Sequence, residues 1–263
     1  MKQFEDYSNS YEYAAMRKED GILEVRFHVG DGPLTWDQAT HRQLASLFVD
    51  IGADPSTRVI ILTGTGDAFS DGYGSIHSQP LGDGVLPTGW NRHDNMVWEG
   101  AKMLESLLNV EVPIIAAVNG PARIHAELAL LSDIVLASDT AVFSDEAHFG
   151  RGIVPGDGVH VIWPMLMGVN RSRYFLFTEQ QLSAAEAQEI GLVGEVLPQS
   201  QVLTRAWELA RQLNQKPRLT LRYTRVLLTR PLKKALLDDL YLGLHLEGIG
   251  QAAVKSEERR QTI

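Results

Sequence analysis

The chain of 263 residues contains no cysteine, which excludes disulfide bonds and thiolate metal sites. It also has no run near the roughly 18 apolar residues that a membrane-spanning helix needs. The polar start MKQFEDYSNSYEY has neither the apolar core of a signal peptide nor the arginines of a transit peptide. We therefore expect a cytoplasmic protein with no membrane partner.

Basic residues are in the minority, with 24 Lys and Arg against 33 Asp and Glu and a net charge of −9. Nucleic acids and anionic membranes are bound by basic surfaces. The Arg-rich segment 218–230 carries apolar residues at helical spacing, which is typical of a solvated helix face. A small molecule is therefore the expected partner, and nucleic acid is not.

Three motif classes are absent: the GxSxG elbow, the GxxxxGK[ST] loop and the HExxH metal pair. Gly64-Thr65-Gly66 follows a strand pattern, as a dinucleotide-binding turn does. The stretch AFSDGYGS comes next, however, with turn residues where a helix should begin, which favours a plain turn. We expect neither a cofactor nor a metal.

The first two-thirds of the chain predict a single α/β core. The runs RVIILTGTG, VPIIAAVNG and DIVLASDTAVFS are short and rich in Val and Ile, as in strands buried on both faces. The earlier GILEVRFHVGDG alternates, which predicts an antiparallel or edge strand. Helical patterns cover about 36–51 and 95–108.

After Pro155 the pattern becomes mainly helical. Ser183 and Glu186 form a capping box that opens SAAEAQEIG, and Gly191 closes this helix. Further helical patterns cover 202–213, 219–228 and 232–249.

Pro217 and Pro231 are expected to separate the last three helices, and the tail KSEERRQTI to fray. We predict a core of residues 1–200 and a helical region of residues 201–263, forming a single structural unit.

The segment HFGRGIVPGDG offers a histidine and a carboxylate. His148 and Asp157 are joined by a Gly-rich loop that can fold back. An aspartate that accepts from one ring nitrogen raises the basicity of the other, which can then take a proton from water. A structural hydrogen bond, or an aspartate that only caps the next helix, explains the same residues.

His125 follows a strand end near the start of a helix, where imidazolium is disfavoured. A neutral ring there can donate to a developing oxyanion, or can be a satisfied, half-buried histidine. Glu127 is two residues further on. If both residues are helical, their side chains point about 200° apart, so they are not expected to share a site.

Glu247 lies among apolar residues in YLGLHLEGIG, where burial would raise its pKa, although an exposed acid fits the pattern too. Trp36 follows the turn DGPL and has an indole N–H to donate, or serves only in packing.

Three stretches together resemble the crotonase (enoyl-CoA hydratase/isomerase) superfamily: VIILTGTGDAFSDGYG, VPIIAAVNGPARIHAELALLSDIVLASDTAVFS and GIVPGDG. The similarity spans about residues 15–250. It implies a ββα superhelix with a C-terminal helical region that caps the site, and a homotrimer or dimer of trimers.

Departures from the usual family pattern are informative. The glycines that follow VNG in the family are replaced by Ile124, His125 and Ala126. In AFSDGYG, the backbone amide of Asp71 is the expected other half of the thioester oxyanion hole. Glu127 matches the first of the two hydratase glutamates, but the second falls near His148. Hydratase chemistry with that pair is therefore not expected.

The same departures resemble the branch of β-diketone hydrolases that includes 6-oxocamphor hydrolase. This resemblance implies site roles for the residues His125, His148, Asp157, Glu247 and Trp36. The expected reaction is a retro-Claisen hydrolysis. His148, oriented by Asp157, activates water with help from Glu247, while His125 and Trp36 donate to the substrate carbonyl.

Two alternatives stay open. One is a hydratase, isomerase or hydrolase of CoA thioesters within the crotonase superfamily, and the other is a crotonase-fold binding protein or inert scaffold.

Overall fold

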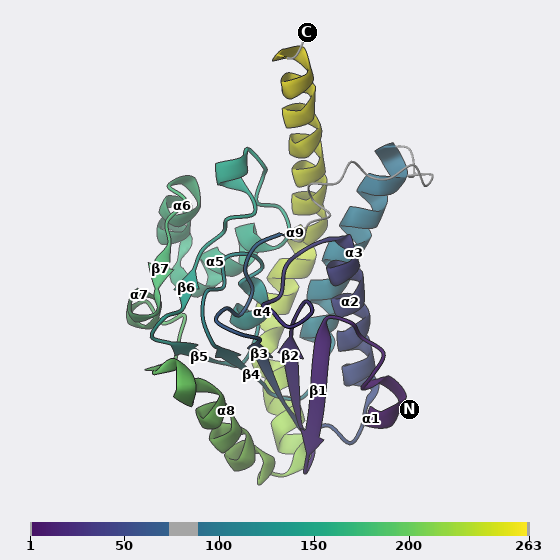
Figure 1. Cartoon of the computed structure of the whole chain (residues 1–263), viewed down its shortest axis with the longest axis vertical. Helices are drawn as coiled ribbons and strands as arrows, with labels where there is room; N and C mark the ends of the chain where they lie inside the picture. Colours follow the sequence, from purple (N-terminus) through teal and green to yellow (C-terminus); the bar gives the residue numbers. More distant parts are fainter. Residues whose placement is uncertain (1, 74–88, 262–263) are drawn as a thin grey trace.

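The computed structural model describes residues 2–73 and 89–261. Within them, a six-stranded sheet of order β1-β2-β3-β4-β5-β8 is parallel except for the antiparallel pair β1–β2 (Figure 1). Its strands are β1 Ala14–Glu19, β2 Ile22–Phe27, β3 Val59–Gly64, β4 Ile114–Val118, β5 Ile134–Ser138 and β8 Glu195–Leu197, and a separate pair consists of β6 Val142–Phe143 and β7 Leu182–Ser183. The Val- and Ile-rich strands β3 and β4 are buried along their whole length, as predicted.

A second row of short pairings runs beside this sheet. Single parallel bridges join Trp36 to Tyr73, Ser70 to Ala122, and Ala122 to Phe143. The chain thus alternates between a strand of the main sheet, a short pairing in the second row, and a helix. This is the winding expected of a ββα superhelix.

Helices cover both faces of the sheet (Figure 1). Helix α8 packs on one face, where Trp207 and its apolar neighbours cover β3 and β4. On the other side, α3 packs against both α2 and α9. The helices are α1 Phe4–Tyr7, α2 Gln38–Ala53, α3 Gly89–Asn109, α4 Glu127–Leu130, α5 Val159–Met167, α6 Val169–Phe177, α7 Ala184–Glu189, α8 Gln199–Asn214 and α9 Arg218–Gln261, with a 3-10 turn at Phe149–Arg151.

The prediction that Pro231 separates two helices is wrong, because α9 continues through it. A proline inside a helix costs about 3 kcal/mol. Arg225 is buried before it and Leu236 and Leu240 are buried after it, so packing holds both halves in line. The expected frayed tail is also helical up to Gln261, and the last two residues lie outside the described part. The break at Pro217, between α8 and α9, is confirmed.

Of three further local predictions, one is confirmed and two are partly right. The capping box of Ser183 and Glu186 is present at the start of α7. Strand β2 is antiparallel to β1, but it is not an edge strand, because β3 flanks it on the other side. DIVLASDTAVFS splits into β5 and β6 at the turn after Ser138. Among the described residues, no helix is both long enough and apolar enough to cross a membrane.

Candidate active site

Four of the predicted site residues come together in the interior. The oxygen Oδ2 of Asp157 lies 3.3 Å from His125 Nδ1 and 3.4 Å from His148 Nε2. Glu247 Oε2, from α9, lies 3.9 Å from the same nitrogen of His148. All four residues are buried. The superhelix therefore places two imidazoles and two carboxylates from separate loops and helices around one point.

The local backbone explains how Asp157 and Glu247 meet. Gly156 packs so closely on α9 that an added Cβ would lie 2.1 Å from the carbonyl oxygen of Gly243. Helices α5 and α9 are also in contact, and α9 runs the height of the molecule past α5 (Figure 1). A glycine at position 156 thus lets the PGDG loop bring its aspartate to the helix that carries Glu247.

The carboxylate that holds His148 most tightly is Asp145, which the sequence analysis missed. His148 Nδ1 donates to Asp145 Oδ1 over 2.6 Å, whereas Asp157 faces the other ring nitrogen. This corrects the expectation that Asp157 alone orients His148. Asp145 lies three residues before the histidine in a loop, and no motif marks that spacing.

The two aspartates determine the charge of His148. Burial by itself lowers the pKa of the ring, but the negative charge of Asp157 and the hydrogen bond to Asp145 together raise it well above 6.5. Burial tends to raise the pKa of Asp157, yet the facing His148 lowers it below its usual range. At neutral pH the pair is an imidazolium and a carboxylate.

His125 adopts a backbone conformation that the helical pattern did not predict. Its φ is +51°, in the left-handed region, and α4 begins only at Glu127. The prediction that His125 and Glu127 point apart is therefore wrong: His125 Nδ1 lies 3.8 Å from Glu127 Oε2. Trp163 donates to the other oxygen of Glu127 over 3.0 Å. Burial, followed by the charges of nearby aspartates, raises the pKa of Glu127 to about 8.

His41, in the first turn of α2, is a second residue that the sequence analysis missed. Its Nε2 lies 2.9 Å from His125 Nε2, and its Nδ1 lies 2.7 Å from the backbone oxygen of Asp37. Burial lowers the pKa of His41. Burial, together with the two neighbouring imidazoles, also lowers the pKa of His125 to about 3, against the opposing charge of Asp157. The only indication of His41 in the sequence was its place on the predicted helix that follows Trp36.

Trp36 takes a different position from the one expected. Its indole N–H donates to Ser70 Oγ over 2.6 Å, and Ser70 in turn donates to the backbone oxygen of Ile124. The N–H is therefore occupied in this structure. The ring instead packs on His125, with ring centroids 4.1 Å apart, and so fixes the plane of that imidazole.

The amide of Asp71 is also occupied. It donates to the backbone oxygen of Leu34 over 3.1 Å, and the carboxylate pairs with Arg123 at 2.6 Å. The expectation that this amide points inward for an oxyanion is therefore not met. One half of the predicted thioester oxyanion hole is closed by a backbone hydrogen bond.

Glu247 completes the cluster. Burial and the charge of Asp157 raise its pKa to about 8, and Gln251 donates to its outer oxygen over 3.0 Å. The possible metal-ligand atoms of His148, Asp157 and Glu247 lie within 4.8 Å of one another, close enough to bind one divalent ion together. A metal would have to displace the proton that His148 holds between its two aspartates. The arrangement therefore favours proton transfer and hydrogen bonding.

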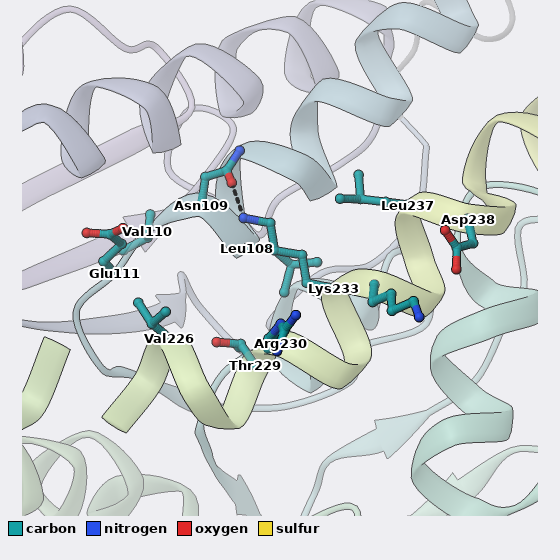
Figure 2. A pocket seen from close by; sticks show the side chains of 11 residues that line it. Leu108, Asn109, Val110, Glu111, Val226, Thr229, Arg230, Lys233, Leu237 and Asp238 are labelled. Carbon is teal, nitrogen blue, oxygen red and sulfur yellow. Dashed lines mark hydrogen bonds between the residues drawn. The ribbon is translucent and has the colours of Figure 1, made fainter. Parts of the chain in front are cut away.

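A separate cleft of about 420 Å³ lies between the end of α3 and α9 (Figure 2). It is lined by mixed charges, including Glu111, Arg230 and Asp238, and Lys233 reaches across it to Asn109. None of its lining residues belongs to the buried cluster, so we assign it no part in the site.

Comparison with known proteins identifies the family. The model of the family described as enoyl-CoA hydratase/isomerase matches residues 17–259. An enoyl-CoA hydratase/isomerase of Bacillus subtilis, YngF, is 30% identical over 84% of this chain and 82% of its own. A 4-chlorobenzoyl coenzyme A dehalogenase of Arthrobacter is 28% identical over 80% and 75%. The chain belongs to the enoyl-CoA hydratase/isomerase family, whose members are enzymes, and it has the crotonase fold.

A narrower similarity comes from solved structures. A β-diketone hydrolase from the cyanobacterium Anabaena, bound to (S)-3-oxocyclohexyl acetic acid, is 46% identical, with a TM-score of 0.89 over 95% of this chain and 98% of that one. An enoyl-CoA hydratase/isomerase from Mycobacterium paratuberculosis is 25% identical, with a TM-score of 0.82 over 91% and 93%. The similarity to a β-diketone hydrolase is thus much greater than the similarity to this CoA-ester enzyme.

Proposed function

We propose that the protein hydrolyses a carbon–carbon bond of a cyclic 1,3-diketone by a retro-Claisen reaction and releases a keto acid. The observation that carries the proposal is the convergence of His125 and His148 on Asp157 in a buried site. The 46% identity to a β-diketone hydrolase supports it independently. The required parts are a proton acceptor, a hydrogen-bond donor and a water molecule, and no cofactor enters the proposal.

The reaction suits these residues. Water adds to one carbonyl while a side chain takes its proton, and the tetrahedral adduct then breaks its bond to the carbon between the carbonyls. The electron pair is stabilised as an enolate by the second carbonyl, and protonation at carbon gives the keto acid. Hydrogen-bond donors aimed at the developing oxyanion supply the main stabilisation in such acyl transfers.

Thioester chemistry is the second candidate, because curated relatives of the family include CoA-ester enzymes. Two features disfavour it. The Asp71 amide donates to Leu34, and an imidazole, His125, stands where the family resemblance implies glycines. A thioester oxygen would therefore lack the pair of backbone donors that the resemblance implies.

The test is a direct comparison of substrates. Purified protein, dialysed against EDTA and free of CoA, is given a bicyclic 1,3-diketone, and loss of the diketone absorbance and formation of keto acid are followed. Crotonyl-CoA is assayed in parallel. Turnover of the diketone alone is expected. Turnover of crotonyl-CoA alone would reject the proposal and return the protein to thioester chemistry.

We further propose that the protein is a homotrimer or a dimer of trimers. Helix α9 carries a series of large apolar side chains that are more than half exposed in the single chain: Leu227, Leu228, Leu242 and Ile249. Large apolar side chains left exposed at several points along one helix are typical of a helix that packs on a partner. Light scattering should give three or six times the 29.1 kDa chain mass. A monomer mass would contradict the proposal.

A further inference from the structure

The direction of each hydrogen bond around His41 is determined by its partners. The backbone oxygen of Asp37 can only accept, so the Nδ1 atom of His41, 2.7 Å away, carries a proton. The ring is half-buried and packs against the imidazole of His125, and desolvation lowers its pKa, so the neutral form is favoured. Its second nitrogen, Nε2, therefore carries no proton and can only accept.

The same logic continues to His125. Its Nε2 lies 2.9 Å from the accepting Nε2 of His41, so it must donate. A neutral His125 then has an unprotonated Nδ1. Among the residues that the structure describes, this nitrogen has no hydrogen-bond partner, and it lies 3.3 Å from Asp157 Oδ2 and 3.8 Å from Glu127 Oε2. The lone pair of His125 Nδ1 and the carboxylate of Asp157 are both acceptors, so a molecule that donates to each of them, such as water, fits between them.

We propose that His125 Nδ1 accepts the proton of the hydrolytic water, and that His41 is a positioning residue that fixes the tautomer needed for this. The assignment rests on the proposed diketone hydrolysis. Water, held by His125 and Asp157, loses one proton to Nδ1 as its oxygen bonds to the carbonyl carbon. When the carbon–carbon bond breaks, its electron pair passes to the enolate, and the proton on His125 moves to the enolate carbon.

His148 then donates the hydrogen bond to the substrate carbonyl. Its two nitrogens face carboxylates at 2.6 Å (Asp145) and 3.4 Å (Asp157), so both carry protons and neither offers a lone pair. This reverses the roles expected from the sequence, where His148 activates water and His125 donates. The attacked carbonyl oxygen receives its hydrogen bond from His148 Nε2–H.

A spectroscopic experiment tests the tautomer without any substrate. Long-range ¹H–¹⁵N spectra of histidine-labelled protein distinguish protonated from unprotonated ring nitrogens, and the His125→Gln variant identifies the signals of that residue. We expect a neutral His125 with its proton on Nε2. In His41→Phe, which cannot accept, the signals should show a mixture of tautomers. His125 protonated on Nδ1 in the unaltered protein would overturn the proposal, whatever the substrate is.

Kinetics test the roles on whichever diketone is turned over. His41→Phe should lower kcat roughly tenfold to hundredfold with little change in KM, since it removes part of the general-base contribution. His41→Gln, whose side-chain oxygen accepts from His125, should restore much of kcat, and His28→Phe, remote from the cluster, should leave it unchanged. Full activity of His41→Phe would refute the role of His41.

Substitution by glutamine distinguishes the roles of His125 and His148, because glutamine donates a hydrogen bond but cannot take up a proton at neutral pH. His148→Gln should therefore keep a larger share of kcat than His125→Gln does. The opposite order would restore His148 as the base. If no diketone is turned over, the proposed function fails while the spectra still decide the tautomer.

Discussion

Replacing Asp145 by asparagine should lower the pKa of His148 by about one unit. Asparagine keeps the size of the side chain and an oxygen that accepts from Nδ1–H, but it removes a negative charge 2.6 Å from the ring. Both side chains are nearly inaccessible, at 5% and 6% exposure, so solvent screens the charge weakly. A hydrogen bond to a charged group contributes about 1.5–3 kcal/mol against about 1 kcal/mol for a neutral one. The difference corresponds to roughly one pKa unit, at about 1.4 kcal/mol per unit.

The pKa of His148 can be followed by an NMR titration of its ring. The control is Asp139→Asn, which removes the same charge from an exposed turn, where salt screens it. Because folding raises the pKa of His148 above 6.5, its contribution to stability is complete below pH 6.5 and is lost as pH rises through the folded-state value. The stability deficit of Asp145→Asn should therefore be largest below pH 6.5. A His148 pKa that falls no further than in the control would refute this account.

Two further predictions concern the contact between the PGDG loop and α9. Glu247 has a pKa raised from 4.5 to about 8, so the protein loses stability as pH rises through that range. In urea unfolding, Glu247→Gln should gain roughly 1–3 kcal/mol relative to the unaltered protein between pH 5 and pH 8, and a constant difference would count against burial of this carboxyl. Gly156→Ala should lose about 1–3 kcal/mol through overpacking, because its Cβ would lie 2.1 Å from the Gly243 oxygen. Gly52→Ala, in α2 with its nearest neighbour 3.9 Å away, is the matched control and should be neutral or stabilising. Equal stability of the two alanine variants would contradict the predicted clash.

Sequence patterns predicted the sheet well because its central strands are buried on both faces. β3 and β4 need continuous Val, Ile and Ala to fill the layers above and below them, and that composition is visible without any tertiary information. The predicted helix break at Pro231 was wrong for the opposite reason. The packing of Leu236 and Leu240 outweighs a local preference, and packing between distant elements leaves no local pattern.

The site was predicted only in part, for a related reason. His125, His148, Asp157 and Glu247 were singled out from local patterns and given site roles by a family resemblance, and the structure brings them together. Asp145 and His41 were not found. Asp145 acts from an irregular loop, and His41 lies 84 residues from its partner His125.

The backbone amide of Asp71 bears on the choice between the proposed diketone and a thioester. The resemblance implies that a thioester site uses backbone amides as donors, yet here the Asp71 amide is already bonded to Leu34.

The cluster also contains buried acceptors. Among the described residues, Asp157 Oδ1 and His125 Nδ1 are buried without a hydrogen-bond partner. Leaving each one unpaired costs about 1–3 kcal/mol, so a ligand that donates protons is held strongly. Water is such a ligand, whereas the keto form of a diketone only accepts and, under the proposed function, takes its hydrogen bond from His148. In the proposed diketone hydrolysis, the unpaired acceptors therefore hold the water and the imidazolium of His148 holds the substrate carbonyl.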